Sequence, residues 1–440
     1  MSGIAGIYYL DGRPVEEHEI RGMGESMSHR GPDGIHTWRD GSVGLAHCML
    51  HTTPESLIEK QPVIGGEGNY VLTADAQIDN RDELISKLRM QRKPTEITDS
   101  DLIMASYEKW GRACVDHLIG DFAFAIWDKK QDRLMLFRDH FGVKPIYYYK
   151  VDEIIAFGSE IKALLSLSNV PEVLDESVIG TYMADSFEPT ATIFQNILRL
   201  EPSSLLLISI NEFKKFNYYK LEGSDVPDNL SDSEYTERFR ELFFQSVKRR
   251  TRSAYPVAAE LSGGLDSSFV TSVAVNYLEK DNNLPLHTVS NIYEILSQCD
   301  ERDFINEVYQ SDKMKQHYNI VEKDDMFTLL SEIFKQNEDG RVFGNHYMLW
   351  MNAKNAGNAG ARVLLTGQDG DTTVGHGYRY LSDLANENKW KEFSQNINQL
   401  LQVHNESDNH LSIRKRWGSP KDLFRKYGKK YYIKNIKEKN

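Results

Sequence analysis

The chain has 440 residues, of which 40% are hydrophobic and 27% charged, with a net charge of −13. This length exceeds one ordinary hydrophobic core and the apolar content excludes a wholly disordered chain, so we expect two or three domains. No apolar run reaches the ~18 residues of a membrane helix, and the N-terminus lacks a secretory signal pattern. Three widely spaced cysteines do not indicate a disulfide framework or a zinc site. These features predict a cytoplasmic protein that binds neither membrane nor nucleic acid.

The first half of the chain is predicted to be rich in short strands. Apolar runs bounded by Gly, Asp, Asn or Pro cover residues 4–9, 43–49, 70–73, 121–127, 133–138, 146–149 and 154–158. Helical patterns lie between them at 80–88 and 100–110, and Thr98-Asp99 is a plausible cap for the second. Strands flanked by helices in this way indicate a layered α+β sandwich.

The second half begins after a polar stretch at 221–234 that has the composition of a linker. Helical patterns and short apolar strands then alternate, with helices at 235–249 and 267–278 and strands at 256–261, 286–289 and 361–366. This alternation predicts an α/β domain with a doubly wound parallel sheet. We therefore expect an N-terminal domain over 1–215, a linker over 216–234 and a C-terminal domain over 235–440.

The strongest local pattern is Leu261-Ser262-Gly263-Gly264-Leu265-Asp266-Ser267-Ser268, which follows an expected strand and opens an expected helix. The glycines let the backbone approach an anion, and the helix N–H groups and serine hydroxyls can donate to pyrophosphate oxygens. Asp266 can hold a magnesium ion that bridges those oxygens. Ser-Gly-Gly alone would indicate only a capped turn, but the strand, loop and helix together favour a phosphate site. The octet lacks the lysine of a Walker loop, so we do not expect hydrolysis at the γ-phosphate.

This octet resembles the pyrophosphate loop of the N-type ATP pyrophosphatases, and residues 364–374 resemble the matching motif of asparagine synthetase. The resemblance implies that the octet forms the ATP site together with four further residues, Ser290, Asn291, Thr366 and Gly367. It also implies that Asp266 and Asp371 bind Mg2+, so that ATP and Mg2+ are both required.

The first half resembles the class II glutamine amidotransferase domain of the same family, the asparagine synthetase B family. The similar segments are His29-Arg30-Gly31-Pro32-Asp33 and residues 120–128, 138–145 and 157–164, in the family's order and spacing. The resemblance covers about residues 1–380. It implies a four-layer sandwich of the N-terminal nucleophile type, followed by a PP-loop domain with a parallel sheet.

The glutamine pocket of that family is not retained. Ser2 stands where the family has its nucleophilic cysteine, and Met49 replaces the arginine that binds the glutamine carboxylate. Asp75 and Gln77 replace the Asn and Glu that form the oxyanion site and hold the α-amine. Of the pocket residues, Asp99 matches the family. We therefore expect the N-terminal domain to be inactive as a glutaminase.

Without ammonia from glutamine, the attacking amine is expected to come with the substrate. Family members that lack the N-terminal cysteine include β-lactam synthetases and the cyclases that close the macrolactam of lasso peptides. Gln368 stands where asparagine synthetase has an acid and the β-lactam branch a tyrosine, and residues 299–304 and 370–377 resemble the lasso cyclase branch. The resemblance implies an AMP-forming amide ligase whose carboxylate substrate is a precursor peptide delivered with its processing protein.

Two alternatives stay open. One is an asparagine synthetase that uses ammonia to convert aspartate to asparagine. The other is a non-catalytic homologue that binds ATP or a peptide, because family members supply a pyrophosphate-facing lysine from a helical region beyond the Asp371 motif. Residues 411–440 carry eleven Lys/Arg against two Asp/Glu. This basic stretch is either solvated or a phosphate-binding wall, in which case the lysine lies within 415–430.

Overall fold

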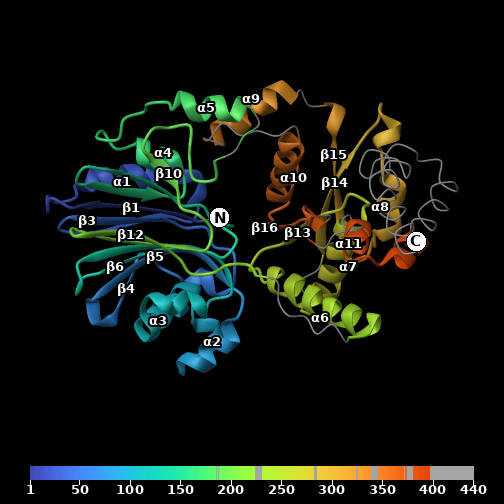
Figure 1. Ribbon diagram of the computed structural model, residues 1–440, viewed down its shortest axis with the longest axis horizontal. Coiled ribbons are helices and arrows are strands. Elements are labelled where there is room, and N and C mark those ends of the chain that lie inside the picture. Colours follow the sequence, from blue (N-terminus) through green and yellow to red (C-terminus); the bar gives the residue numbers. More distant parts are fainter. Residues whose placement is uncertain are drawn as a thin grey trace, which may run out of the picture. The chain divides into compact units, whose positions relative to one another are not determined.

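The structure is a computed structural model (Figure 1), in which residues Met1–Thr366 form one compact unit and the described residues from Gly367 onward belong to a second. It describes residues 1–184, 186, 188–222, 230–281, 285–323, 326–336, 338, 345–370, 372–373 and 380–396. Within these residues, no helix combines the length and the hydropathy needed to cross a membrane.

The first sheet of the N-terminal half has six antiparallel strands in the order β10-β8-β9-β1-β3-β2. They are β1 (Gly3–Tyr9), β2 (Ile35–Asp40), β3 (Val43–Cys48), β8 (Tyr147–Val151), β9 (Ile154–Gly158) and β10 (Ile197–Arg199). Helices α1 (Glu17–Ser26) and α4 (Ile161–Leu165) cover its outer face, where Ile7, Ile20 and Leu164 share one buried cluster. Helix α5 (Glu176–Met183) follows α4 in the chain.

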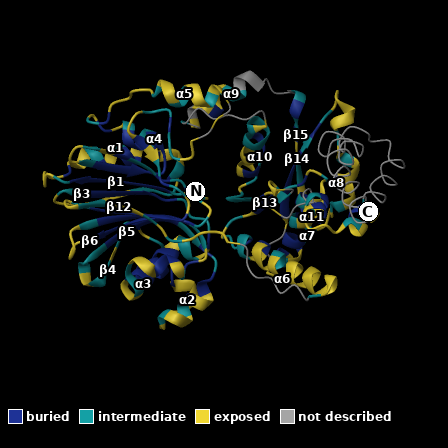
Figure 2. Cartoon of the chain, viewed as in Figure 1, coloured by how far each residue is buried: buried dark blue, intermediate teal, exposed yellow. Residues whose placement is uncertain are grey.

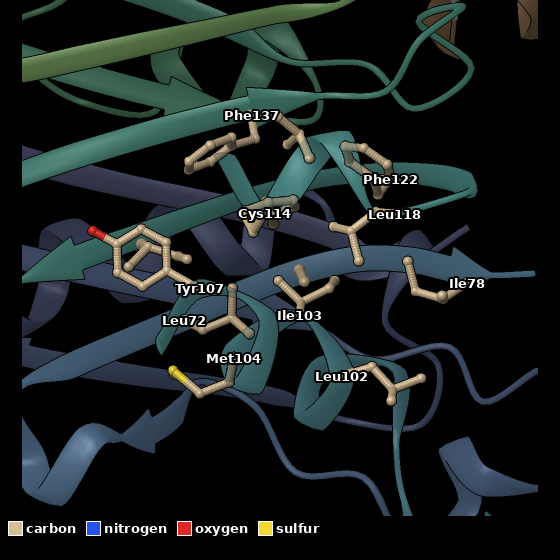
Figure 3. Packing of buried hydrophobic residues seen from close by; sticks show 14 of the residues in the cluster. Leu72, Ile78, Leu102, Ile103, Met104, Tyr107, Cys114, Leu118, Phe122 and Phe137 are labelled. Carbon is tan, nitrogen blue, oxygen red and sulfur yellow. The ribbon is translucent and has the colours of Figure 1, made fainter. Parts of the chain in front are cut away.

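The second sheet also has six antiparallel strands, in the order β12-β11-β7-β6-β5-β4. They are β4 (Val63–Gly65), β5 (Tyr70–Ile78), β6 (Gly120–Asp128), β7 (Arg133–Arg138), β11 (Ser204–Ser209) and β12 (Glu212–Asn217). Helices α2 (Arg81–Leu88) and α3 (Asp99–Trp110) pack on its outer face. Figure 3 shows how Ile103 of α3 packs among side chains of the sheet such as Leu72 and Phe122.

The inner faces of the two sheets form a third core. Neighbouring residues of β1 point to opposite faces, so Ile4 lies in the core between the sheets and Ala5 in the core under α1. Because both faces of β1 are covered, all seven of its residues are buried (Figure 2). The four layers, helices–sheet–sheet–helices, confirm the predicted sandwich.

The second half contains a parallel sheet in the order β15-β14-β13-β16. Its strands are β13 (Val257–Glu260), β14 (Leu286–Ile292), β15 (Met314–Ile320) and β16 (Val363–Leu365). Helix α7 (Leu265–Lys280) packs on the face that carries Ala259, and α10 (His346–Asn358) packs through Ala356 on the face that carries Ala258. Helices on both faces confirm the predicted double winding.

Helix α6 (Asp232–Arg250) packs against α7 through the stacked rings of Phe243 and Phe269, whose centroids are 4.2 Å apart. Further helices are α8 (Arg302–Val308), α9 (Met326–Gln336) and, in the second unit, α11 (Tyr380–Asn386). The division into domains 1–215 and 235–440 with a linker over 216–234 stays a prediction.

The strands at 133–138 and 154–158 match their predicted bounds, whereas other strands differ in length or were not predicted, as β5 and β15 illustrate. β5 continues to Ile78, five residues past its predicted end, because its polar residues find partners in the interior. β15 has no counterpart among the predicted strands because most of its residues are polar and it lies at the edge of the sheet. The predicted cap of α3 is confirmed, since the Asp101 N–H donates to Thr98 Oγ1 at 3.1 Å.

Candidate nucleotide site and amidotransferase-like pocket

The predicted pyrophosphate loop lies between the end of β13 and the start of α7. Gly263 has φ +84°, in the left-handed region that favours glycine, and a Cβ there would lie 2.8 Å from the Cβ of Phe304. Gly264 is the N-cap residue of α7, whose first N–H groups have no partner within the helix. The octet therefore forms a loop that leads directly into the N-terminus of α7. Gly263, where the loop packs most closely against Phe304, carries no side chain.

The serines of the octet stabilise the loop from within. Ser262 Oγ lies 2.9 Å from Ser267 Oγ, and Ser262 Oγ also accepts the Gly264 N–H at 3.3 Å. Ser268 Oγ is buried and has no hydrogen-bond partner among the described residues. A buried hydroxyl without a partner is costly. The loop can therefore offer this hydroxyl, together with the helix N–H groups, to an anion.

The two candidates on β14 support the loop from behind. Ser290 is buried and its Oγ donates to the Leu261 carbonyl at 2.6 Å, while the Leu261 N–H donates to the Val289 carbonyl at 2.9 Å. Asn291 accepts from the Asn319 side chain at 3.1 Å, within a group of amide side chains that face α10. Direct contact of Ser290 or Asn291 with a nucleotide stays a prediction.

The remaining candidates differ in how far the structure describes them. Asp266 lies in the first turn of α7, is partly exposed and forms no ion pair with another described residue. Thr366 is exposed at the end of β16, the neighbour of β13 in the sheet. Gly367 and Gln368 belong to the second compact unit, where Gln368 is exposed. Asp371 lies outside the described residues, as do residues 411–440.

The donors of this site fit the phosphates of ATP. The backbone N–H groups of the loop and of the N-terminus of α7, together with the buried Ser268 hydroxyl, can donate to an anion. Asp266 can supply an oxygen ligand to a cation. The described residues contain no group of three or more His, Cys, Asp or Glu placed to hold a metal. Mg2+ does not require one, because it commonly takes one or two carboxylates and completes its shell with phosphate oxygens and water.

The pocket that resembles a glutamine site is a separate cavity of ≈ 50 Å³ in the N-terminal half. Its lining includes Ser2, Leu50, Thr53, Glu59, Asp75, Gln77, Asp99 and Lys144. A cavity needs about 10–15 Å³ on this measure to hold one water, so this one has room for only a few waters. Met49 is buried, but it is not among the residues that line the cavity.

A buried ion pair fills one side of this cavity. Lys144 Nζ donates to Asp75 Oδ1 at 2.9 Å, and both side chains are almost fully buried. Burial, the largest single influence, would raise the pKa of Asp75, but the charge and hydrogen bond of Lys144 together with the charges of the N-terminus and Arg30 outweigh it, and the pKa is lowered. Ser2 Oγ is also engaged, because it accepts the Leu50 N–H at 3.1 Å.

Asp99, the pocket residue that matches the family, forms ion pairs with two arginines. Its carboxylate accepts from Arg81, from Arg252 at 3.3 Å and from the Ile78 N–H at 3.1 Å. Its side chain is 7% exposed. Gln77 points toward the same segment as Arg252, since its Nε2 donates to the carbonyl of Arg249 at 3.4 Å.

Several residues at this pocket were not predicted as site residues. Lys144 lies in the segment 138–145, which we identified only by its similarity to the family's amidotransferase domain, and nothing local in the sequence pairs it with Asp75. Glu59 lines the cavity, accepts the Ser100 N–H at 3.0 Å, and burial raises its pKa to about 7. Charge complementarity to Asp99 is the signal that could have indicated Arg252, but it requires the tertiary contact.

Fold and sites together define a two-part protein, in which an amidotransferase-like sandwich precedes a parallel sheet with a pyrophosphate loop. Residues 1–219 match the glutamine amidotransferase domain and residues 238–438 match asparagine synthase. The chain belongs to the asparagine synthetase family.

Two relatives illustrate the similarity. The chain is 33% identical over 299 residues to asparagine synthetase (glutamine-hydrolyzing) 3 of Bacillus subtilis (strain 168), which covers 67% of this chain and 48% of that protein. It is 31% identical over 351 residues to a Methanocaldococcus jannaschii protein assigned to the same class, covering 76% of this chain and 67% of that protein. The chain thus spans about half to two thirds of these relatives' length.

Among solved structures, the allosteric regulatory enzyme of purine biosynthesis is similar with a TM-score of 0.37 and 13% sequence identity. The match covers 72% of this chain and 80% of that one. A TM-score at this level does not by itself establish a common fold.

Proposed function

We propose that this protein is an ATP-dependent, AMP-forming amide ligase that uses an amine carried by its own substrate. The observation that carries the proposal is the contrast between two sites. In the pyrophosphate loop the Ser268 hydroxyl has no partner among the described residues, whereas in the glutamine-like pocket Asp75 and Asp99 already pair with basic residues of the chain itself. Membership of the asparagine synthetase family supports the ligase class.

The reaction has two steps. The substrate carboxylate attacks the α-phosphorus of ATP, which gives an acyl-adenylate and pyrophosphate. The amine then attacks the acyl carbon, which gives the amide, AMP and a proton. In the first step, the N–H groups of α7 and the hydroxyls of Ser262 and Ser268 bind the departing pyrophosphate. Asp266, with Asp371 as the second ligand, would hold Mg2+, which supplies positive charge for the same oxygens.

The second step needs an amine, and the glutamine-like pocket is a poor source of ammonia. Met49 cannot pair with a carboxylate, and the Asp75 oxygen bonded to Lys144 brings negative charge to the position expected for an oxyanion. The arginines on Asp99 compete with a substrate ammonium for the same carboxylate. An amine on the substrate removes the need for this pocket. We therefore propose a macrolactam in a lasso-type peptide as the product, with the precursor peptide and its processing protein as partners.

Exchange of labelled pyrophosphate into ATP tests the first step without any amine. We expect exchange with a peptide carboxylate, no stimulation by aspartate with ammonium, and no effect of glutamine. Asp266→Asn should abolish exchange because it removes a ligand of Mg2+. Asp281→Asn, at the other end of α7, is the matched control and should leave exchange unchanged.

The other outcomes identify the alternatives. Exchange that requires aspartate, with asparagine formed from ammonium, would contradict the cyclase proposal and support an ammonia-dependent asparagine synthetase. ATP binding without exchange for any carboxylate would support a non-catalytic homologue. Hydrolysis of glutamine to glutamate would overturn the assignment of the N-terminal pocket.

A further inference from the structure

The segment 249–254 comprises the end of α6 and the first part of its connection to β13, and it is bound to the N-terminal half. The Arg250 guanidinium donates to Asp121 Oδ1 at 2.9 Å, and the Ala254 N–H donates to the Thr52 carbonyl at 2.8 Å. All of these residues belong to the compact unit Met1–Thr366. The segment is therefore fixed immediately before β13 begins at Val257.

Arg252 is the centre of this attachment. It donates to Glu55 Oε2 at 2.8 Å, to the Ile78 carbonyl at 3.1 Å and to Asp99 Oδ2 at 3.3 Å. Arg81 bridges the same two carboxylates from the other side. The network contains two guanidinium groups and two carboxylates, all largely buried, so its charges balance. The planar guanidinium of Arg252 can donate to these three acceptors at the same time. A lysine ammonium is less suited to this geometry.

The start of β16 is held in the same manner. Arg362, directly before β16, donates to Asp33 Oδ1 at 3.0 Å and to the His51 carbonyl at 2.7 Å. Its guanidinium lies 3.9 Å from the centre of the Tyr255 ring. β13 and β16 are neighbours in the sheet, with Val257 opposite Val363. Both strands are thus anchored where they begin, and the residues predicted to bind ATP lie where they end.

We propose that Asp99, which lines the glutamine-like pocket, binds this chain's own Arg252, and that Asp99 and Arg252 are positioning residues for the pyrophosphate loop. Asp99 holds Arg252, Arg252 fixes the entry to β13, and β13 is only four residues long, so its entry determines where Ser262 and Gly263 lie. The amidotransferase-like half is then a scaffold for the nucleotide site. This inference rests on the proposed function only in taking the loop as the ATP site.

Hydrogen exchange measured by mass spectrometry on the unliganded full chain tests the positioning. We compare the wild type with Asp99→Asn and Arg252→Lys, which keep size or charge but lose the shared contacts. Amides in 257–264 should exchange at least about 10-fold faster in both variants, while β7 keeps its protection. Affinity for the magnesium complex of α,β-methylene-ATP should fall about 10-fold. Arg92→Met is the control, because it breaks only the exposed pair with Asp101, at 2.6 Å.

Unchanged exchange in 257–264 and unchanged nucleotide affinity in both variants would overturn the inference, even if their melting temperatures fall. If Asp99→Asn does not fold, Arg252→Lys decides the question because it leaves Asp99 and Arg81 paired. If the wild type does not bind the nucleotide analogue, the proposed function fails, whereas the exchange measurement still tests whether Arg252 positions β13.

Discussion

The pyrophosphate loop and the glutamine-like pocket are built from different parts of the chain. The loop uses backbone N–H groups, a left-handed glycine and hydroxyls that lie within eight consecutive residues. The pocket uses charged side chains from distant segments, such as Lys144 and Asp75, which are 69 residues apart. A site made from backbone depends on few side chains. A site made from charged side chains changes its ligand when a few of them are replaced.

This difference gives the two sites separate expected roles. The loop keeps donors without partners, as a binding site for an anion requires. In the pocket, arginines and a lysine neutralise the carboxylates, as a stable interior requires. Substitutions in the loop should therefore alter nucleotide affinity directly. Substitutions in the pocket should alter stability, and should alter nucleotide affinity only where they break the contact between Asp99 and Arg252.

The largest effect is expected from Lys144→Met. It leaves Asp75 buried without its partner, which should lower the free energy of unfolding by about 3–5 kcal/mol. Urea denaturation measures the loss. Lys130→Met, at an exposed position, is the control and should change stability little. A stability equal to the wild type would mean that the pair does not form and that the pocket is open.

Gly263→Ala should act on the loop instead. The new Cβ meets Phe304 at 2.8 Å and the backbone is in the left-handed region, so the loop must shift. A strain of about 1–3 kcal/mol corresponds to nucleotide binding weakened roughly 10- to 100-fold, measured by calorimetry with an ATP analogue. Gly180→Ala, where a Cβ meets nothing within 4 Å, is the matched control. Binding that is unchanged in Gly263→Ala would separate ATP recognition from this loop.

Glu59→Gln tests whether the Glu59 carboxyl in the pocket makes the stability of the protein depend on pH. Burial raises the pKa of Glu59 to about 7, so the folded protein holds this proton more tightly than the unfolded chain. Stability should be greatest below the ordinary pKa of about 4.5 and fall as the pH rises to about 7. Because Glu59 is partly exposed, we expect about 1–2 kcal/mol across this range. Glu59→Gln should flatten the profile measured by chemical denaturation, whereas Glu96→Gln, at an exposed position, should not.

The smallest effect is expected from Thr98→Ala. Thr98 caps α3, the helix that begins with Asp99, and its hydroxyl accepts the Asp101 N–H. Its loss should lower stability by about 1 kcal/mol without changing nucleotide affinity. Thr95→Ala, at an exposed position outside the helix, serves as the control. A fall in nucleotide affinity as large as that of Gly263→Ala would contradict a role for Thr98 that is confined to capping α3.

Much of the fold was predictable because its signals are local. β7 and β9 match their predicted bounds, since each is a short apolar run between turn residues. The loop and its helix were also predictable, because strand, glycines and serines are contiguous. β15 was not predictable. It lies at the edge of the sheet, where polar residues such as Lys315 and Gln316 give no hydrophobic pattern.

The sequence by itself determined the four-layer sandwich, the parallel sheet with its pyrophosphate loop, and the replacement of the glutamine-binding residues. The sandwich, the sheet and the loop depend on residues that are close together in the chain. The replaced residues are recognised because their side chains cannot do what the family's residues do. Only the tertiary structure decided what the residues at these pocket positions are bonded to. Lys144 pairs with Asp75 and Arg252 with Asp99 across 69 and 153 residues. Such pairs form because a buried charge needs an opposite charge, wherever in the chain that charge lies.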